Sequence, residues 1–237
     1  MAVPFTATTD QTFARFRWST TSGLDAIAAA PDGEVEDYAV TIDTPPPFVA
    51  QCTATGPGDP FADAVTLYAP TAIVLPQRRD PSQILGPPDF NGLGLNPERF
   101  TTLGQSGGEI VVAFRDNILS NSGDAGPELS VSEIGGVENF NLFVFPYPET
   151  ELILQEAGIT AETDGSYLIA SNVSTASIDI DPVFGNLFAQ GRLQFAGVRI
   201  VSVTSSGDGP DIDALTANFS QSCSEIRNPS DLSLIHI

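Results

Sequence analysis

The chain has 237 residues, of which 41% are hydrophobic, so it can bury a sizeable core, and its 21 glycines and 19 prolines act as turn signals between short segments. The formal net charge is −21 and all nine basic residues are arginine, which argues against nucleic acid or anionic lipid as a partner. The single histidine is His236, near the C-terminus, which argues against a Ser-His-Asp triad or a histidine-bound zinc site, and no apolar run is long enough for a membrane span.

Residues 1–43 are predicted to contain two β-strands. In the first, Phe16 and Trp18 alternate with Arg15 and Arg17, the period of a half-buried strand. Two strands alone bury no stable core. This segment is therefore not predicted to form a stable domain by itself.

The second strand begins in the run Gly-Glu-Val-Glu-Asp-Tyr at residues 33–38. That run, with looser matches at 14–17 and 22–24, resembles the closing half of the GEVED-type domain, a β-rich module of large secreted bacterial proteins. The resemblance implies that the upstream half and neighbouring domains belong to a longer chain.

Three consecutive prolines follow at 45–47 and favour an extended segment, so residues 44–63 are interpreted as an inter-domain linker. At the other end, residues 221–237 are predicted to be an unstructured tail. Its last residues, 233–237, look like the translation of a broken reading frame and are excluded from the fold.

Residues 64–220 form the main predicted unit, in which short strands are separated by turn signals. Strands are predicted near residues 64–68, 71–76, 108–115, 128–134, 138–145, 166–171, 175–180, 193–204 and 212–219. Helix-like spacing occurs only briefly, around Gly185. This pattern favours an all-β fold, an antiparallel two-sheet β-sandwich or jelly roll, with a short β fragment before it.

Five sequence words in this unit occur in the order found in one family of sandwiches, at residues 84–89, 107–114, 126–133, 195–200 and 209–215. Together they resemble the galactose-binding-like (discoidin-type) β-sandwich of bacterial cell-surface proteins. The chain departs from that family at 146–165, a longer segment rich in proline and glutamate. The resemblance implies an extracellular or cell-surface location, a structural Ca²⁺ and contact with carbohydrate or another surface ligand.

In the resembling fold a structural Ca²⁺ commonly lies where the loop after the first strand meets the final strand. The matching positions are Asp89, Asn91 and Thr101 on one side and Asp211 and Asp213 on the other. Oxygen ligands of this kind suit Ca²⁺ better than zinc. The alternative is that Asp211 caps a turn and Asp213 faces solvent, and that the acidity of the chain serves solubility.

A second candidate metal cluster consists of Asp124, Glu128 and Glu133. The strand period places Glu133 on the apolar face, where an acid needs a partner. Arg199 or Arg115 could fill that role as readily as a metal ion.

The two cysteines, Cys52 and Cys223, bracket the main unit. A disulfide between them would close a loop of about 170 residues, worth about 4–5 kcal/mol in the chain-entropy model, and would require an oxidising compartment. The alternative is two unrelated free thiols. A catalytic thiol is not expected without a histidine.

Sugar binding usually stacks the sugar ring on an exposed aromatic side chain, for which Tyr147 and Tyr167 are the candidates, with Phe90 and Phe100 as further ones. With 30 acidic residues, carboxylate pairs carry no catalytic signal. We therefore expect a non-catalytic extracellular binding module, Ca²⁺-stabilised and contacting glycans or other surface ligands. The alternative is a structural spacer without a ligand in a large surface protein.

Overall fold

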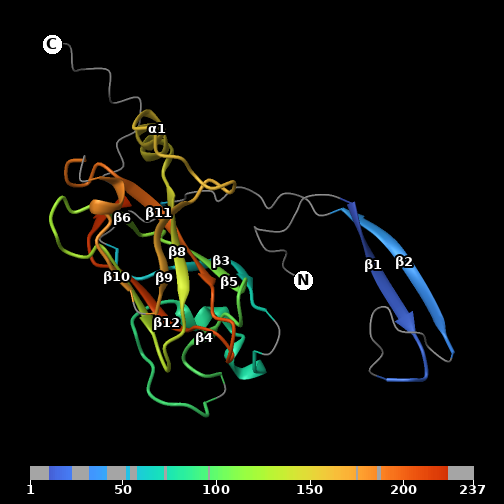
Figure 1. The fold of residues 1–237 in the computed structure, drawn as a ribbon. Helices are drawn as coiled ribbons and strands as arrows, with labels where there is room; N and C mark the ends of the chain where they lie inside the picture. The colour runs from blue at the N-terminus through green and yellow to red at the C-terminus, as the bar shows by residue number, and fades with distance from the viewer. Residues whose placement is uncertain are drawn as a thin grey trace. The chain divides into compact units, whose positions relative to one another are not determined.

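The computed structural model describes residues 11–22, 32–41, 52–53, 58–71, 74–95, 97–174, 176–185 and 188–223. The chain divides into two compact units between Pro46 and Pro47. The first unit contains an antiparallel hairpin of β1 (Gln11–Trp18) and β2 (Glu34–Thr41), shown in blue in Figure 1. The two strands predicted for this region are therefore present.

The second unit consists mainly of strands. Its strands are β3 (Ala64–Ala69), β4 (Thr101–Thr102), β5 (Glu109–Ala113), β6 (Asn117–Ser120), β7 (Leu129–Glu133), β8 (Phe140–Pro146), β9 (Tyr167–Val173), β10 (Ala176–Ile178), β11 (Gln194–Ser202), β12 (Asp211–Ala217) and β13 (Ser220–Ser222). Its helices are α1 (Pro148–Glu156) and the short 3-10 helices η1 (Pro76–Arg78), η2 (Pro81–Ile84) and η3 (Pro182–Phe184). Within the described residues, no helix is long and apolar enough to cross a membrane.

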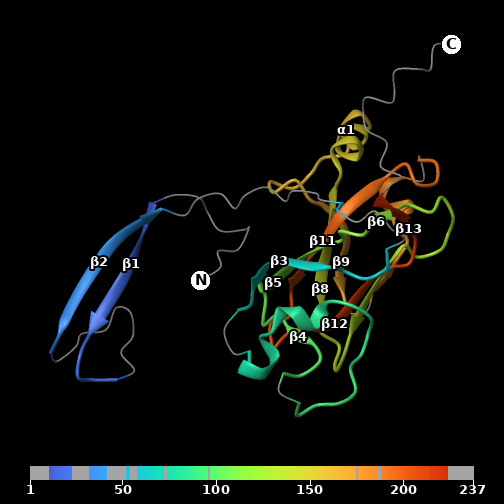
Figure 2. The same ribbon diagram turned by 180° about the vertical axis from the view of Figure 1, so that it is seen from behind.

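The strands of the second unit form two antiparallel sheets, as predicted. The smaller sheet has the order β10-β7-β12-β4. In the larger sheet β11 is central: β8 and then β9 lie on one side, and β5 and β6 pair with successive parts of β11 on the other. β3 and β13 extend that side by pairing with β5 and β6. Figures 1 and 2 show α1 at one end of this sandwich and β4 at the other.

The core lies between the two sheets and follows from strand alternation. Ile110 and Val112 of β5 and Val198 and Ile200 of β11 point into it, as the period of two requires. In β12 the pairing with β7 shifts between Ile212 and Ala214, and this bulge lets both Ile212 and Leu215 join the core. In β11 the register of its pairing with β8 changes between Phe195 and Gly197.

Two predicted elements differ from the structure. No strand occurs at 71–76 in the described residues there, because Pro76 begins η1 instead. The segment 146–165, read only as an insertion, contains α1: Pro148 occupies its first turn, Glu149 and Glu151 favour its N-terminus, and Leu154 is buried.

The second unit extends further than predicted at both ends. Phe61 forms a β-bridge with Thr216 and Ala62 belongs to the core, so the interpretation of 44–63 as linker extends too far. β13 reaches Ser222, so residues 221–223 are part of the fold and the predicted tail begins later. Residues 224–237 lie outside the described residues.

Candidate metal site

Three carboxylates meet at one edge of the smaller sheet. Glu128 immediately precedes β7, while Asp179 and Asp181 follow β10. Because β10 runs antiparallel to β7, with Ile178 opposite Leu129, the residues before β7 and after β10 lie side by side. Each of the three carboxylates offers an oxygen within 4.8 Å of the others.

The two most buried members of this triad are held by hydrogen bonds. Glu128 is 0% exposed and accepts hydrogen bonds from the Ser122 amide (2.9 Å) and the Ile180 amide (2.6 Å). Asp181 is 4% exposed and accepts from the Asn121 side-chain amide (2.9 Å) and the Gly123 amide (2.6 Å). A carboxylate can accept about four hydrogen bonds, so both retain acceptor capacity for a further ligand.

No arginine of the described residues forms an ion pair with Glu128, Asp179 or Asp181. Burying carboxylates together is costly unless a positive charge compensates them. The triad could therefore hold a metal ion, and its oxygen-only donor set suits a hard cation.

Of the second predicted cluster, only Glu128 belongs to the triad. Asp124 lies beside it, because the Ser122 hydroxyl donates to Asp124 (3.2 Å) as well as to Glu128. Glu133 is at the other end of β7, opposite Ile212, so the structure does not bring it to Glu128.

Sequence reasoning missed Asp179 and Asp181 because Asp179 fell inside a strand predicted over 175–180 and Asp181 directly after it. The strand ends at Ile178, and the two acids belong to the turn that follows. The available signal was an Asp-Ile-Asp-Pro run, since a proline directly after an acid favours a strand end.

The residues of the first predicted metal site lie in the same region, but their side chains do not converge on one point. Asp213 is buried at the β12 bulge and accepts a hydrogen bond from the Asp89 amide (3.3 Å), so the two loops do meet as the resemblance implied. Burial raises the pKa of Asp213. The Asp89 carboxylate, however, pairs with Arg99 (2.5 Å), and Asn91 is exposed.

The other members of that set have partners within the chain. The Thr102 hydroxyl donates to Asp211, which also lies 3.6 Å from the Arg78 guanidinium. The Thr101 hydroxyl donates to the Asp80 carbonyl (2.7 Å). In the described part of the chain, these positions do not form a group of acidic side chains close enough to share an ion.

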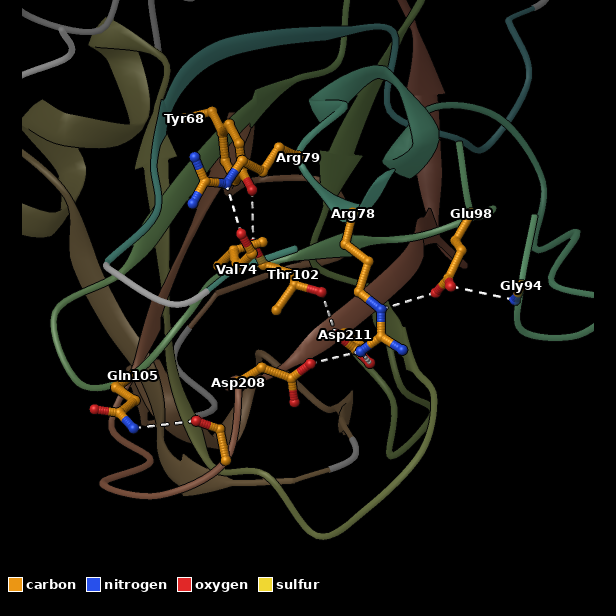
Figure 3. A network of polar contacts seen from close by, with 11 residues as sticks. Tyr68, Val74, Arg78, Arg79, Gly94, Glu98, Thr102, Gln105, Asp208 and Asp211 are labelled. Carbon is orange, nitrogen blue, oxygen red and sulfur yellow. Dashed lines mark hydrogen bonds and ion pairs between the residues drawn. The ribbon is translucent and has the colours of Figure 1, made fainter. Parts of the chain in front are cut away.

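Arg78 is the counterion of the acids around Asp211, namely Glu98, Asp208 and Asp211 itself (Figure 3). It extends from η1 and lies 2.8 Å from Glu98 and 2.5 Å from Asp208, which approach it from opposite sides. The guanidinium also lies over the Phe100 ring, 5.0 Å from its centroid. One arginine thus joins η1 to the loop before β12.

Acids still outnumber the guanidinium in this region. Burial, reinforced by the charges of nearby acids, raises the pKa of Glu133 to about 7 and that of Glu138 to about 7. Burial also raises the pKa of Asp211 to about 6, although Thr102 and Arg78 oppose the shift. This region is therefore expected to take up protons near neutral pH.

Of the two arginines suggested as partners of Glu133, Arg115 is exposed and Arg199 is engaged elsewhere. Arg199 pairs with Asp164 (3.2 Å) and lies 3.7 Å from Glu109, and it stacks over the Phe143 ring at 4.1 Å from the centroid. Its side chain therefore covers the outer face of the larger sheet and does not pair with Glu133.

Three of the four predicted sugar-stacking residues are buried. Tyr147 is 7% exposed and Tyr167 is 2% exposed, with the Tyr167 ring packed edge-on against Phe184. Phe100 is also buried, whereas Phe90 is exposed (37%). Neither tyrosine presents the open ring face that stacking on a sugar requires.

Cys52 and Cys223 form a disulfide, with their Cα atoms 5.4 Å apart. Thr53 donates its amide to the Arg115 carbonyl (2.8 Å), and Ser222 pairs with Asn117 in β6. The bridge thus joins the two ends of the described part of the sandwich, and of the two alternatives that the sequence left open the disulfide is the one present.

Comparison with known protein families, curated protein sequences and solved structures finds no match to this chain. The resemblances to a galactose-binding-like sandwich and to a GEVED-type domain therefore stay predictions. The fold and the acidic sites are what the function has to be argued from.

Proposed function

We propose that this chain is a non-catalytic module of a secreted or surface-exposed bacterial protein, and that Ca²⁺ bound by Glu128, Asp179 and Asp181 fastens its sandwich. One observation carries the proposal: three carboxylates, two of them buried, lie within 4.8 Å of one another without an arginine partner among the described residues. A divalent ion would compensate their charge and join the residues before β7 to those after β10.

The donor set favours calcium over other ions. Carboxylate and carbonyl oxygens at turns suit Ca²⁺, which accepts six to eight ligands in flexible geometry, whereas Mg²⁺ requires a stricter octahedron. The disulfide agrees with an oxidising compartment, where calcium is abundant and sites with modest affinity are filled.

The burial of the triad supports a structural ion and not a catalytic one. Glu128 has no exposed surface, so a substrate could not reach its carboxylate without a rearrangement of the loops. Hydrogen bonds from the Ser122, Gly123 and Ile180 amides fix the geometry in advance. Such preorganised acids suit an ion that stays in place.

The test is the melting temperature of EDTA-treated protein titrated with Ca²⁺ or Mg²⁺. At ten times its dissociation constant, an ion that binds only the folded state stabilises it by about 1.4 kcal/mol. We expect Ca²⁺ to raise the melting temperature more than Mg²⁺ does. Asp179→Asn should lose the response, while the matched control Asp89→Asn should keep it. A wild-type protein that does not respond to Ca²⁺, or an undiminished response in Asp179→Asn, would overturn the proposal.

Two roles remain for such a module, a spacer and a glycan-contacting domain. Burial of Tyr147 and Tyr167 favours the spacer, since neither ring is open to a sugar. Affinity electrophoresis in polysaccharide gels and a glycan array distinguish the two: retardation by any polysaccharide would favour glycan contact through other residues.

A further inference from the structure

One face of the β1–β2 hairpin combines exposed aromatic rings with carboxylates. In the hairpin register Trp18 pairs with Glu34 and Phe16 pairs with Glu36. Residues two apart on a strand share a face, so Tyr38 lies on the same face as Glu36. Each aromatic residue of β1 on this face therefore has an acid opposite it on β2.

This face is open in the described part of its unit. Phe16 is 61% exposed, Tyr38 51% and Trp18 83%. Phe16 and Tyr38 meet edge to face with ring centroids 5.6 Å apart, and the Tyr38 hydroxyl donates to Glu36. Together with Glu36 they line a hollow of about 500 Å³.

The chemistry of this hollow indicates the charge of its occupant. Aromatic ring faces attract cations, and a neighbouring carboxylate adds a charge-assisted hydrogen bond. Glu34 and Glu36 lie on the same face, and the net charge of −21 attracts cations at long range. An arginine or lysine side chain offers both the charge and an apolar stem to cover the rings.

The hairpin also indicates that the occupant is a polypeptide. Two strands alone are marginally stable in water, and among the described residues neither β1 nor β2 pairs with a third strand, so the outer edge of each offers backbone groups to one. Added β structure satisfies that edge, which a small cation cannot do.

We propose that this face binds an extended arginine- or lysine-bearing polypeptide segment of another protein. Its cationic side chain lies against Phe16 and Tyr38 and pairs with Glu36. This inference is independent of the calcium site, which belongs to the other unit.

The chain contains its own reporter for this test. Trp18 is the only tryptophan and lies on the proposed face, so its fluorescence reports on that face alone. The full chain is titrated with a short peptide of alternating arginine and valine, and with a control peptide of alternating glutamine and valine. We expect a saturable blue shift with the arginine peptide and little change with the control.

Variants locate the binding. Glu36→Gln removes the carboxylate with little change in shape and should weaken the arginine peptide about tenfold. Phe16→Leu should weaken it severalfold. The matched control is Val35→Thr, which keeps a β-branched residue on the opposite face and should bind as the wild type does.

The wild-type titration tests the proposal even if a variant disturbs the hairpin. The absence of a saturable shift with the arginine peptide, or an equal shift with the glutamine peptide, overturns it. An unchanged affinity in Glu36→Gln also overturns it. A Trp18 shift that depends on protein concentration alone, with dimers in sedimentation, would show that a second copy occupies the face instead.

Discussion

The two ends of the smaller sheet both contain buried carboxylates, but the charge of these carboxylates is compensated differently at each end. Glu128 lies beside the end of β12, whereas Asp211 lies beside the end of β7, so the two acidic regions are a strand length apart. Around Asp211 the chain supplies Arg78 as a counterion. Around Glu128 no described arginine does so. In a chain with 30 acids and nine arginines most carboxylates have no guanidinium of their own, and a buried site without one is where an external cation contributes most.

The largest expected effect comes from the disulfide and sets the scale for the effects at the two ends. Replacing both cysteines, Cys52→Ser with Cys223→Ser, should lower the free energy of unfolding by about 4–5 kcal/mol, because the unfolded chain regains the entropy that the closed loop removes. Urea unfolding measures the loss. Unchanged stability would mean that the bridge does not constrain the unfolded chain.

The next largest effect is expected at the Asp211 end, where Arg78 is the counterion. Arg78→Met leaves Glu98, Asp208 and Asp211 without their shared guanidinium and should cost about 3 kcal/mol. The control is Arg192→Met, which breaks an exposed pair with Glu149 and should cost about 1 kcal/mol or less. Equal losses in the two variants would contradict the role given to Arg78.

At the Glu128 end, removal of a charge in the absence of calcium should raise the free energy of unfolding and not lower it. Asp179→Asn keeps an oxygen to accept the Asp181 amide and removes one of three clustered charges. In EDTA it should raise the free energy of unfolding by about 1–2 kcal/mol, since like charges at this separation repel one another. With calcium present the order of variant and wild type should reverse. A variant that is less stable in EDTA would show that the triad is not under repulsion.

The smallest effect is a pH dependence at the Arg78 end. The raised pKa values of Glu133, Glu138 and Asp211 mean that the folded state holds protons which the unfolded chain has released. Their contribution to stability is therefore fully present below the unfolded pKa of about 4.3 and is lost as the pH rises through 6 to 7.

In EDTA, the free energy of unfolding should be lower at about pH 8 than at about pH 5, by roughly 1 kcal/mol once solvent screening is taken into account. Glu138→Gln should flatten this dependence, whereas Glu162→Gln at an exposed position should not. A stability that rises over this pH range in EDTA would contradict the assignment.

Strand alternation made most of the fold predictable. β7, β8 and β11 carry apolar residues at the period of two, and their predicted ranges agree with the structure within a few residues. β6 and β13 were missed because each is short and stabilised by its neighbours in the sheet and not by its own pattern. The helix α1 was missed because its proline and glutamates were interpreted as a departure from a family, although they favour a helix start.

The acidic sites were only partly predictable. Asp89 and Asp213, which are in contact, were grouped only through the resemblance to a galactose-binding-like sandwich. Asp89 pairs with Arg99, and Asp211 lies beside Arg78. The pattern of residues along the chain does not indicate which arginine will lie beside which acid in the folded protein. Glu128 was placed in a candidate cluster, but its neighbours depended on where β10 ends.

The disulfide also determines how this unit would respond to mechanical load. Tension that enters the chain before Cys52 and leaves after Cys223 passes across the covalent bridge and bypasses the strands between them. The sandwich would thus stay folded under a pull that would otherwise peel β13 from β6. Reduction would lengthen the unit under force by the 171-residue separation that the bridge spans, turning a stiff joint into an extensible one.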